Sequence, residues 1–138
     1  MRILALDPGT VRVGIAVSDE LKLIAQPLEF IPAKPFDDFL ARLRQLLQEK
    51  QVELILVGLP RNMDGSYGPA AEQVREFIAE LSGRVTVPIQ SWDERLTSVM
   101  ANRALIHGRV RRAERKRKVD QTAATILLQS YLDAKSGT

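Results

Sequence analysis

Cysteine is absent from this chain of 138 residues, and histidine occurs once, as His107. Without cysteine there are no disulfides, thiolate zinc sites or cysteine nucleophiles, and one histidine excludes a histidine-rich metal cluster. No run approaches the about 18 consecutive apolar residues of a membrane-spanning helix. The N-terminus reaches a carboxylate at Asp7, too early for the apolar core of a signal peptide. Chemistry must therefore use carboxylates, hydroxyls and basic groups, and we expect a cytoplasmic protein.

The length and composition are those of one globular domain. At roughly 100–200 residues per domain, residues 1–138 are expected to form a single unit, which excludes architectures with two lobes. Apolar residues make up 45% of the chain and charged residues 27%. Such a chain is neither disordered nor of low complexity, and it can bury one core.

The positive charge is concentrated in one segment. The net charge is only +3, but positions 109–118 hold seven basic residues and one glutamate, a local charge of +6 that leaves −3 for the rest. The basic residues are Arg109, Arg111, Arg112, Arg115, Lys116, Arg117 and Lys118. This basic block cannot pack in a core, and it offers a polyanion a dense site for counterion release. The alternative is a solvated, flexible loop at about 107–118.

Three β-rich runs are predicted to open the chain. Arg2–Leu6 and Val11–Val17 flank the turn residues 7–10 and read as a hairpin. A third run, Leu21–Ile31, contains Pro27, which places it at a sheet edge or gives it a bulge. The remaining predicted elements are a helix from Phe36 to Leu47, a buried strand at Val52–Leu59, a helix from Pro69 to Gly83, a strand from Val85 to Ile89, a short helix at Thr97–Ile106 and a helix at Val119–Ala134.

This order predicts an α/β fold. Right-handed crossovers make the first, fourth and fifth strands parallel neighbours, which gives a mixed five-stranded sheet in the order 3-2-1-4-5 with helices on both faces. Ligands of such sheets gather at the carboxyl ends of the parallel strands.

Three carboxylates are candidates for chemistry at that edge. Asp7 ends the first strand, Glu94 follows the last strand, and Asp120 lies in the first turn of the C-terminal helix. Converging carboxylates repel one another, and divalent cations offset this cost; oxygen-only ligands suit Mg²⁺ or Mn²⁺. Two such ions, about 3.5–4 Å apart, can activate a water and stabilise a leaving oxygen at a phosphodiester. The pattern therefore favours metal-dependent phosphodiester hydrolysis.

Each candidate also has an ordinary structural explanation. Asp7 can be a turn former, Glu94 can pair with Arg95, and Asp120 can complement a helix N-terminus. Other residues are assigned no catalysis: His107 is expected at a helix end, Trp92 in packing or in base stacking, and Tyr67 in a loop. The loop at 61–66 follows the central strand, where Arg61 and backbone N–H groups can hold a phosphate; it can equally be a plain connection.

Four segments together identify a resemblance. They are Leu4-Ala-Leu-Asp-Pro-Gly-Thr with Val13-Gly-Ile-Ala-Val-Ser-Asp19, Gly58-Leu-Pro-Arg-Asn-Met-Asp-Gly-Ser66, Asp93-Glu-Arg-Leu-Thr97, and Val119-Asp-Gln with Ala123-Ala124 and Leu128-Gln-Ser-Tyr-Leu-Asp133. Across nearly the whole chain, the sequence resembles the YqgF (RuvX) family of bacterial proteins. The resemblance implies an RNase H-like fold and a nuclease that acts on Holliday junctions or on the precursor of small-subunit ribosomal RNA.

The resemblance also implies that Asp7, Glu94 and Asp120 form an acidic metal site. The chain departs from wider relatives at two positions: Gly58 stands where these often carry a second acid, so Glu94 must substitute, and Ala123 stands three residues after Asp120, where junction resolvases can carry another. This chain thus offers three acids where such resolvases have four.

Two rival functions remain. The segment Asp7-Pro8-Gly9-Thr10 is similar to phosphate hairpins of sugar kinases and actin, but a second phosphate loop is missing. The other rival is a non-catalytic module that binds nucleic acid or ribosome precursors through the basic block. The sequence leaves DNA and RNA open as substrates, and it leaves a homodimer, which symmetric cutting of a junction suggests, without a readable interface.

Overall fold

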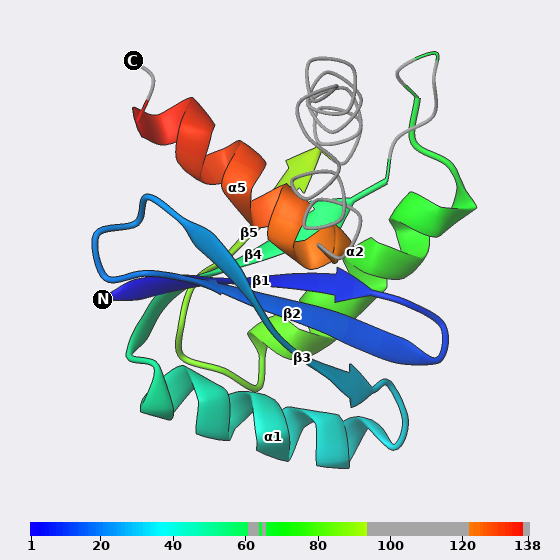
Figure 1. Cartoon of the computed structure of the whole chain (residues 1–138). Coiled ribbons are helices and arrows are strands. Elements are labelled where there is room, and N and C mark those ends of the chain that lie inside the picture. Colours follow the sequence, from blue (N-terminus) through cyan, green and yellow to red (C-terminus); the bar gives the residue numbers. More distant parts are fainter. Residues whose placement is uncertain (61–63, 65, 94–121, 137–138) are drawn as a thin grey trace, which may run out of the picture.

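The computed structural model describes residues 1–60, 64, 66–93 and 122–136. Its centre is a mixed sheet in the order β3-β2-β1-β4-β5 (Figure 1). The strands are β1 (Arg2–Pro8), β2 (Arg12–Ser18), β3 (Ala25–Pro32), β4 (Val52–Leu59) and β5 (Ile89–Asp93). β1 pairs antiparallel with β2 and parallel with β4, and β5 lies parallel to β4. The predicted strand order and mixed pairing are confirmed.

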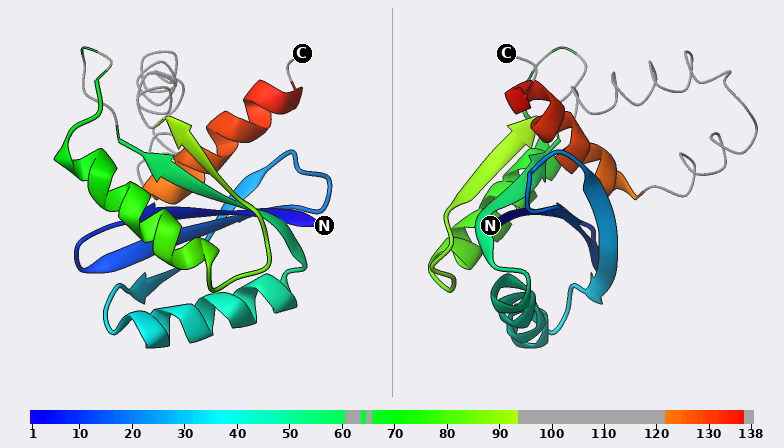
Figure 2. Two further views of the ribbon diagram at one scale, coloured as in Figure 1. Left: turned by 180° about the vertical axis from the view of Figure 1, so that it is seen from behind. Right: turned by 60° about the vertical axis from the view of Figure 1, so that its left-hand side comes forward.

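Helices cover both faces of the sheet (Figures 1 and 2). The helices α1 (Phe36–Glu49) and α2 (Pro69–Ser82) lie on one face, and α5 (Ala123–Ser136) lies on the other. Alternate residues of β1 divide between two cores: Leu4 and Leu6 pack with α1 and α2, whereas Ile3 and Ala5 pack with α5. Within the described ranges, no helix is long and apolar enough to cross a membrane.

The first three strands differ in extent from the prediction. β1 continues past Leu6 because Asp7 pairs with Gly14 and Pro8 with Val13. The predicted start of the third strand at Leu21 is wrong, because β3 begins at Ala25. Asp19 holds the intervening residues in a turn: its Oδ1 accepts the N–H groups of Leu23 at 2.8 Å and Ile24 at 3.0 Å. These hydrogen bonds lower the pKa of Asp19.

Pro27 predicts that its strand lies at a sheet edge or contains a bulge, and the structure shows both. β3 is an edge strand, and its register with β2 shifts between Ile15 and Ala16, whose partners are Glu29 and Pro27. Glu29 anchors this edge to α1: Arg42 donates from Nε to Oε2 at 3.0 Å and from Nη2 to Oε1 at 2.7 Å. This pairing lowers the pKa of Glu29. The edge strand is therefore fixed to the layer beneath it.

The last strand begins later than predicted. Residues 85–88 form no strand, although Val85 and Val87 still pack on the core, and β5 starts at Ile89. Pro88 has no amide hydrogen to donate, and its carbonyl accepts the N–H of Ile55 at 2.9 Å. The predicted helix at Thr97–Ile106, the basic block and the start of the helix predicted from Val119 lie outside the described residues.

The turn between β1 and β2 is closed by a short backbone contact. Gly9 donates its N–H to the carbonyl of Arg12 at 3.0 Å, and a Cβ at Gly9 would stand 2.6 Å from that oxygen. No side chain fits there without moving the backbone. The glycine thus fixes the turn that follows Asp7.

We expect Gly9→Ala to lower the free energy of unfolding by about 1–3 kcal/mol, because the added methyl group collides with backbone. Urea denaturation measures the change. The matched control is Gly83→Ala, because a Cβ at Gly83 meets nothing within 4 Å and its φ is −80°. Equal stability of the Gly9→Ala variant and the wild type would contradict this role of the turn.

Candidate functional site

Asp7 lies half-buried near the carboxyl end of β1, the central strand of the sheet. Side chains alternate along a strand, so Asp7 shares the face of Ile3 and Ala5, which α5 covers. Its partner on β2 is Gly14. The predicted place of Asp7, at the carboxyl edge of the parallel strands, is thus observed.

Glycines stand on both sides of Asp7. Gly14 is its neighbour on β2, and Gly58 on β4 directly follows Val57, the partner of Leu6. Gly58 lies on the α5 face, because Leu54 and Leu56 pack on that side. The adjoining position on each neighbouring strand therefore carries no side chain. Sequence reasoning noted Gly58 only as the place of a missing acid, and the pairing of Gly14 with Asp7 was not anticipated.

The start of α5 lies above this part of the sheet, over the carboxyl end of β1 (Figures 1 and 2). A Cβ built on Gly14 would stand 3.9 Å from Cβ of Ala124. Thr122 caps the helix: its Oγ1 accepts the N–H of Thr125 at 3.2 Å and lies 2.7 Å from Oγ1 of Thr125. The positive end of the helix dipole thus faces the edge at which Asp7 lies, and it favours negative charge there. Thr122 was missed, although a threonine ahead of an alanine-rich helix is a capping signal.

β5 ends at the same edge. Its last residue, Asp93, pairs with Leu59 at the end of β4. Trp92 packs toward α5: its indole N–H donates to Oγ of Ser130 at 3.2 Å, and its ring meets Tyr131 edge-on, with centroids 5.1 Å apart. The packing interpretation of Trp92 is confirmed. By alternation, Asp93 points to the opposite face from Trp92.

The described part of the loop after β4 is ordered by its own side chains. Oδ1 of Asp64 accepts the N–H of Ser66 at 2.9 Å and its hydroxyl at 2.6 Å, which lowers the pKa of Asp64. Tyr67 precedes α2, and the guanidinium carbon of Arg75 lies 4.7 Å from its ring centroid. Tyr67 is therefore a loop residue, as predicted.

Several predicted site residues lie outside the described residues. They are Glu94, Asp120, His107, Arg61 and the basic block of Arg109, Arg111, Arg112, Arg115, Lys116, Arg117 and Lys118. Among the residues that are described, no three histidine or acidic side chains group as a metal site. Of the three candidate carboxylates, Asp7 alone belongs to the described part of the chain.

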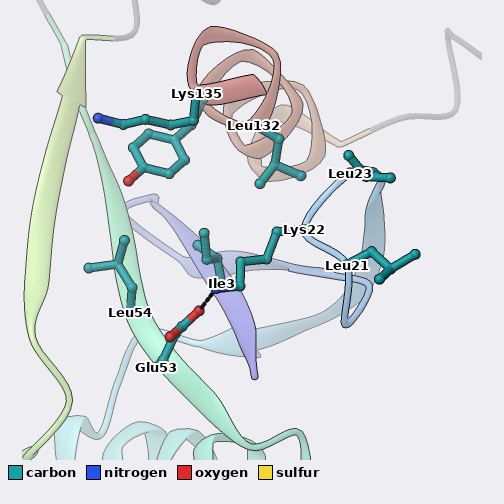
Figure 3. A pocket seen from close by; sticks show the side chains of 9 residues that line it. Ile3, Leu21, Lys22, Leu23, Glu53, Leu54, Leu132 and Lys135 are labelled. Atoms are coloured by element: carbon teal, nitrogen blue, oxygen red, sulfur yellow. Dashed lines mark ion pairs between the residues drawn. The ribbon is translucent and has the colours of Figure 1, made fainter. Parts of the chain in front are cut away.

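A pocket of about 450 Å³ lies at the other end of β1, away from Asp7 (Figure 3). Ile3, Leu54 and Leu132 contribute apolar walls. Its carboxylate, Glu53, forms an ion pair with Lys22, which lowers the pKa of Glu53. This pocket shares no residue with the candidate site.

Comparison with known proteins identifies the family of the chain by sequence. A family model named RuvX, described as Holliday junction resolvase, matches residues 1–134. A protein of Symbiobacterium thermophilum is 45% identical over 136 residues, covering 99% of this chain and 94% of that protein. One of Geobacillus kaustophilus is 47% identical over 137 residues, covering 98% and 99%. Both carry the name "Putative pre-16S rRNA nuclease".

Solved structures share the fold at low sequence identity. RuvC of Thermus thermophilus in complex with a Holliday junction substrate aligns with a TM-score of 0.62 at 15% identity, covering 100% of this chain and 97% of that one. The fowlpox virus Holliday junction resolvase aligns with a TM-score of 0.53 at 14% identity, covering 97% and 99%. The predicted RNase H-like fold is thereby confirmed.

We expect Thr122→Ala to lower the free energy of unfolding by about 1 kcal/mol, because the substitution removes the capping acceptor from the first turn of α5. Urea denaturation measures the change, and amide hydrogen exchange should show faster opening at Thr125. Thr122→Ser keeps the hydroxyl and serves as the control. If the alanine and serine variants are equally stable, the cap does not hold the helix start.

Proposed function

This chain belongs to the RuvX family, and we propose that it is a divalent-metal-dependent endonuclease that hydrolyses phosphodiester bonds in structured nucleic acid. The observation that carries the proposal is Asp7, a carboxylate between two glycines at the carboxyl edge of the parallel strands. In open α/β sheets this edge is where ligands bind. The two glycines place no side chain of their own beside Asp7 on either adjoining strand.

Glu94 and Asp120 are proposed to complete the acidic site. Glu94 directly follows Asp93, the last residue of β5, and has the same parity as Trp92, whose side chain lies on the α5 face. Asp120 stands two residues before Thr122, the cap of α5. The described neighbours of both acids thus lie at the edge that holds Asp7. These placements support three carboxylates on one face.

The donor set suits a hard cation. The chain has no cysteine and one histidine, so the proposed ligands are oxygens, which favour Mg²⁺ or Mn²⁺. Asp7, Glu94 and Asp120 would hold the metal. When bound, one or two such ions supply an activated water and charge stabilisation for the leaving 3′-oxygen in an in-line displacement.

The protein's own residues position this chemistry. The pairing of β1 with β2 and β4 fixes the backbone of Asp7, and packing of α5 on the sheet fixes the helix start above it. The proposed role of the basic block and Arg61 is to bind the phosphate backbone of the substrate. A non-catalytic binding module is the alternative, because the local charge of +6 at 109–118 by itself explains binding.

Two substrates are compatible with the relatives. Curated relatives are named for the precursor of 16S rRNA, and a structural neighbour was solved with a Holliday junction. Symmetric cutting of a four-way junction needs two sites, so a resolvase activity would also require a homodimer. An RNA-processing activity carries no such requirement.

We expect Asp7→Asn to abolish Mg²⁺- or Mn²⁺-dependent cleavage while folding and nucleic-acid binding remain, because the change removes one charged metal ligand and keeps the shape. Cleavage is measured on a labelled four-way DNA junction and on a precursor rRNA with unprocessed ends. Paired cuts in the junction indicate a resolvase, and selective cutting of the RNA indicates a processing nuclease.

The matched control for Asp7→Asn is Asp37→Asn, an exposed aspartate in the first turn of α1. It should cleave like the wild type. Unchanged cleavage by Asp7→Asn would refute the role assigned to Asp7. Binding by the wild type without cleavage that depends on Asp7 would favour the binding module.

Replacement of Arg111, Arg112, Arg115 and Arg117 by alanine should weaken binding and flatten its dependence on salt. On duplex DNA, the slope of log K against log salt should fall by up to about 0.9 for each phosphate that the variant no longer neutralises. A variant with Lys34, Arg44, Lys50 and Arg84 replaced carries the same change of charge elsewhere and is the control. An unaltered slope in the first variant would exclude the basic block from binding.

A further inference from the structure

A row of three residues crosses the sheet from Asp7 to its edge. Gly14 on β2 pairs with Asp7 on one side and with Phe30 of β3 on the other. Directly paired residues point to the same face of a sheet, so Phe30 shares the α5 face with Asp7. Phe30 lies two strand spacings, about 10 Å, from Asp7. An aromatic side chain, 46% exposed, thus stands beside the candidate site.

Arg12 of β2 lies over this aromatic ring. Its guanidinium carbon is 4.1 Å from the ring centroid of Phe30, which is the geometry of a cation–π contact. The ring in turn covers Gly14: a Cβ built there would lie 3.2 Å from Cε1 of Phe30. Covering a strand glycine is an ordinary structural role for the phenylalanine. This structural role does not explain why the guanidinium of Arg12 lies over the ring.

The guanidinium of Arg12 differs from those of the other arginines that the structure describes. Arg2, Arg42, Arg75 and Arg84 each reach a carboxylate, and Arg44 donates to the carbonyl of Arg84. Arg12 is exposed, and within the described ranges its guanidinium has no carboxylate or carbonyl partner. The ring of Phe30 holds this cation in place while leaving its N–H donors to other acceptors. This arrangement is suited to an anion supplied by a ligand.

We propose that Arg12, held by Phe30, binds a backbone phosphate of the nucleic acid a few nucleotides from the bond that is cut. This rests on the proposed function. The planar guanidinium fork matches two phosphate oxygens. Each strand of a duplex advances about 3.4 Å per nucleotide along the helix axis, so 10 Å along that axis spans about three nucleotides. The contact recognises phosphate and therefore serves DNA and RNA alike.

The test measures binding in the Asp7→Asn background, at a fixed Mg²⁺ concentration, as salt is varied. The probes are a labelled four-way DNA junction and a labelled precursor rRNA fragment. Adding Arg12→Ala should lower the salt slope by about 0.9 on the junction, or by about 0.7 where the contacted strand is single. Arg12→Lys should restore the slope but only part of the affinity, because lysine cannot bind bidentately.

Two further variants separate this role from general charge and packing. Arg84→Ala removes an arginine that stands 6.0 Å over the ring of Phe36, before β5 and away from Asp7, and should leave the slope unchanged. Phe30→Leu keeps cover over Gly14 but removes the cation–π interaction, and should weaken binding with the slope retained. With Asp7 intact, Arg12→Ala should raise KM and leave kcat unchanged.

The outcomes distinguish the two proposals. Equal slopes with and without the Arg12→Ala substitution, with cleavage still dependent on Asp7, would overturn the assignment of Arg12 alone. If Arg12→Ala lowers the slope but Arg12→Lys restores the full affinity, the contact with phosphate is not bidentate. Failure of the protein that retains Arg12 to bind either probe would overturn both this assignment and the proposed function.

Discussion

The pairing of β1 with two different kinds of partner governs the rest of this structure. On one side β1 continues the antiparallel hairpin with β2, and on the other it starts the parallel half of the sheet with β4. Its buried residues supply both cores, so its backbone cannot shift without disturbing each layer. Asp7 stands near the end of this strand. This support would hold the carboxylate in position for the metal binding that we propose.

The glycines beside Asp7 are as important as its position. Gly14 and Gly58 occupy the adjoining strands, and the start of α5 lies above Gly14. Phe30 covers Gly14 from the side away from Asp7, and in doing so it supports Arg12. One face of the sheet therefore carries, in order across the strands, the acid Asp7, then Gly14, and then the guanidinium of Arg12 over Phe30. That order matches a phosphodiester strand lying across the sheet.

Much of the fold follows from local sequence patterns, whereas the surroundings of the site do not. The strand β4 and the helix before Gly83 were predicted closely. Their signals are local, because an apolar run and the residues that end a strand or a helix can be read from neighbouring positions in the sequence. Leu23 and Ile24 look like strand residues, but the carboxylate of Asp19 holds their N–H groups in a turn. Asp7 was identified, but its glycine neighbours depend on strand register, which joins residues far apart in sequence. The contact between Arg12 and Phe30 depends on that register as well.

We propose that a divalent ion binds at the edge of the sheet that holds Asp7. Titration with paramagnetic Mn²⁺, followed in amide NMR spectra, tests this directly because the ion broadens signals of nearby nuclei. We predict that the amides of Asp7, Gly14, Gly58 and Ala124 broaden first, that those of Leu23 and Glu53 at the opposite edge do not, and that Asp7→Asn weakens the effect. Broadening centred elsewhere, or unchanged by Asp7→Asn, would show that the ion does not bind at Asp7.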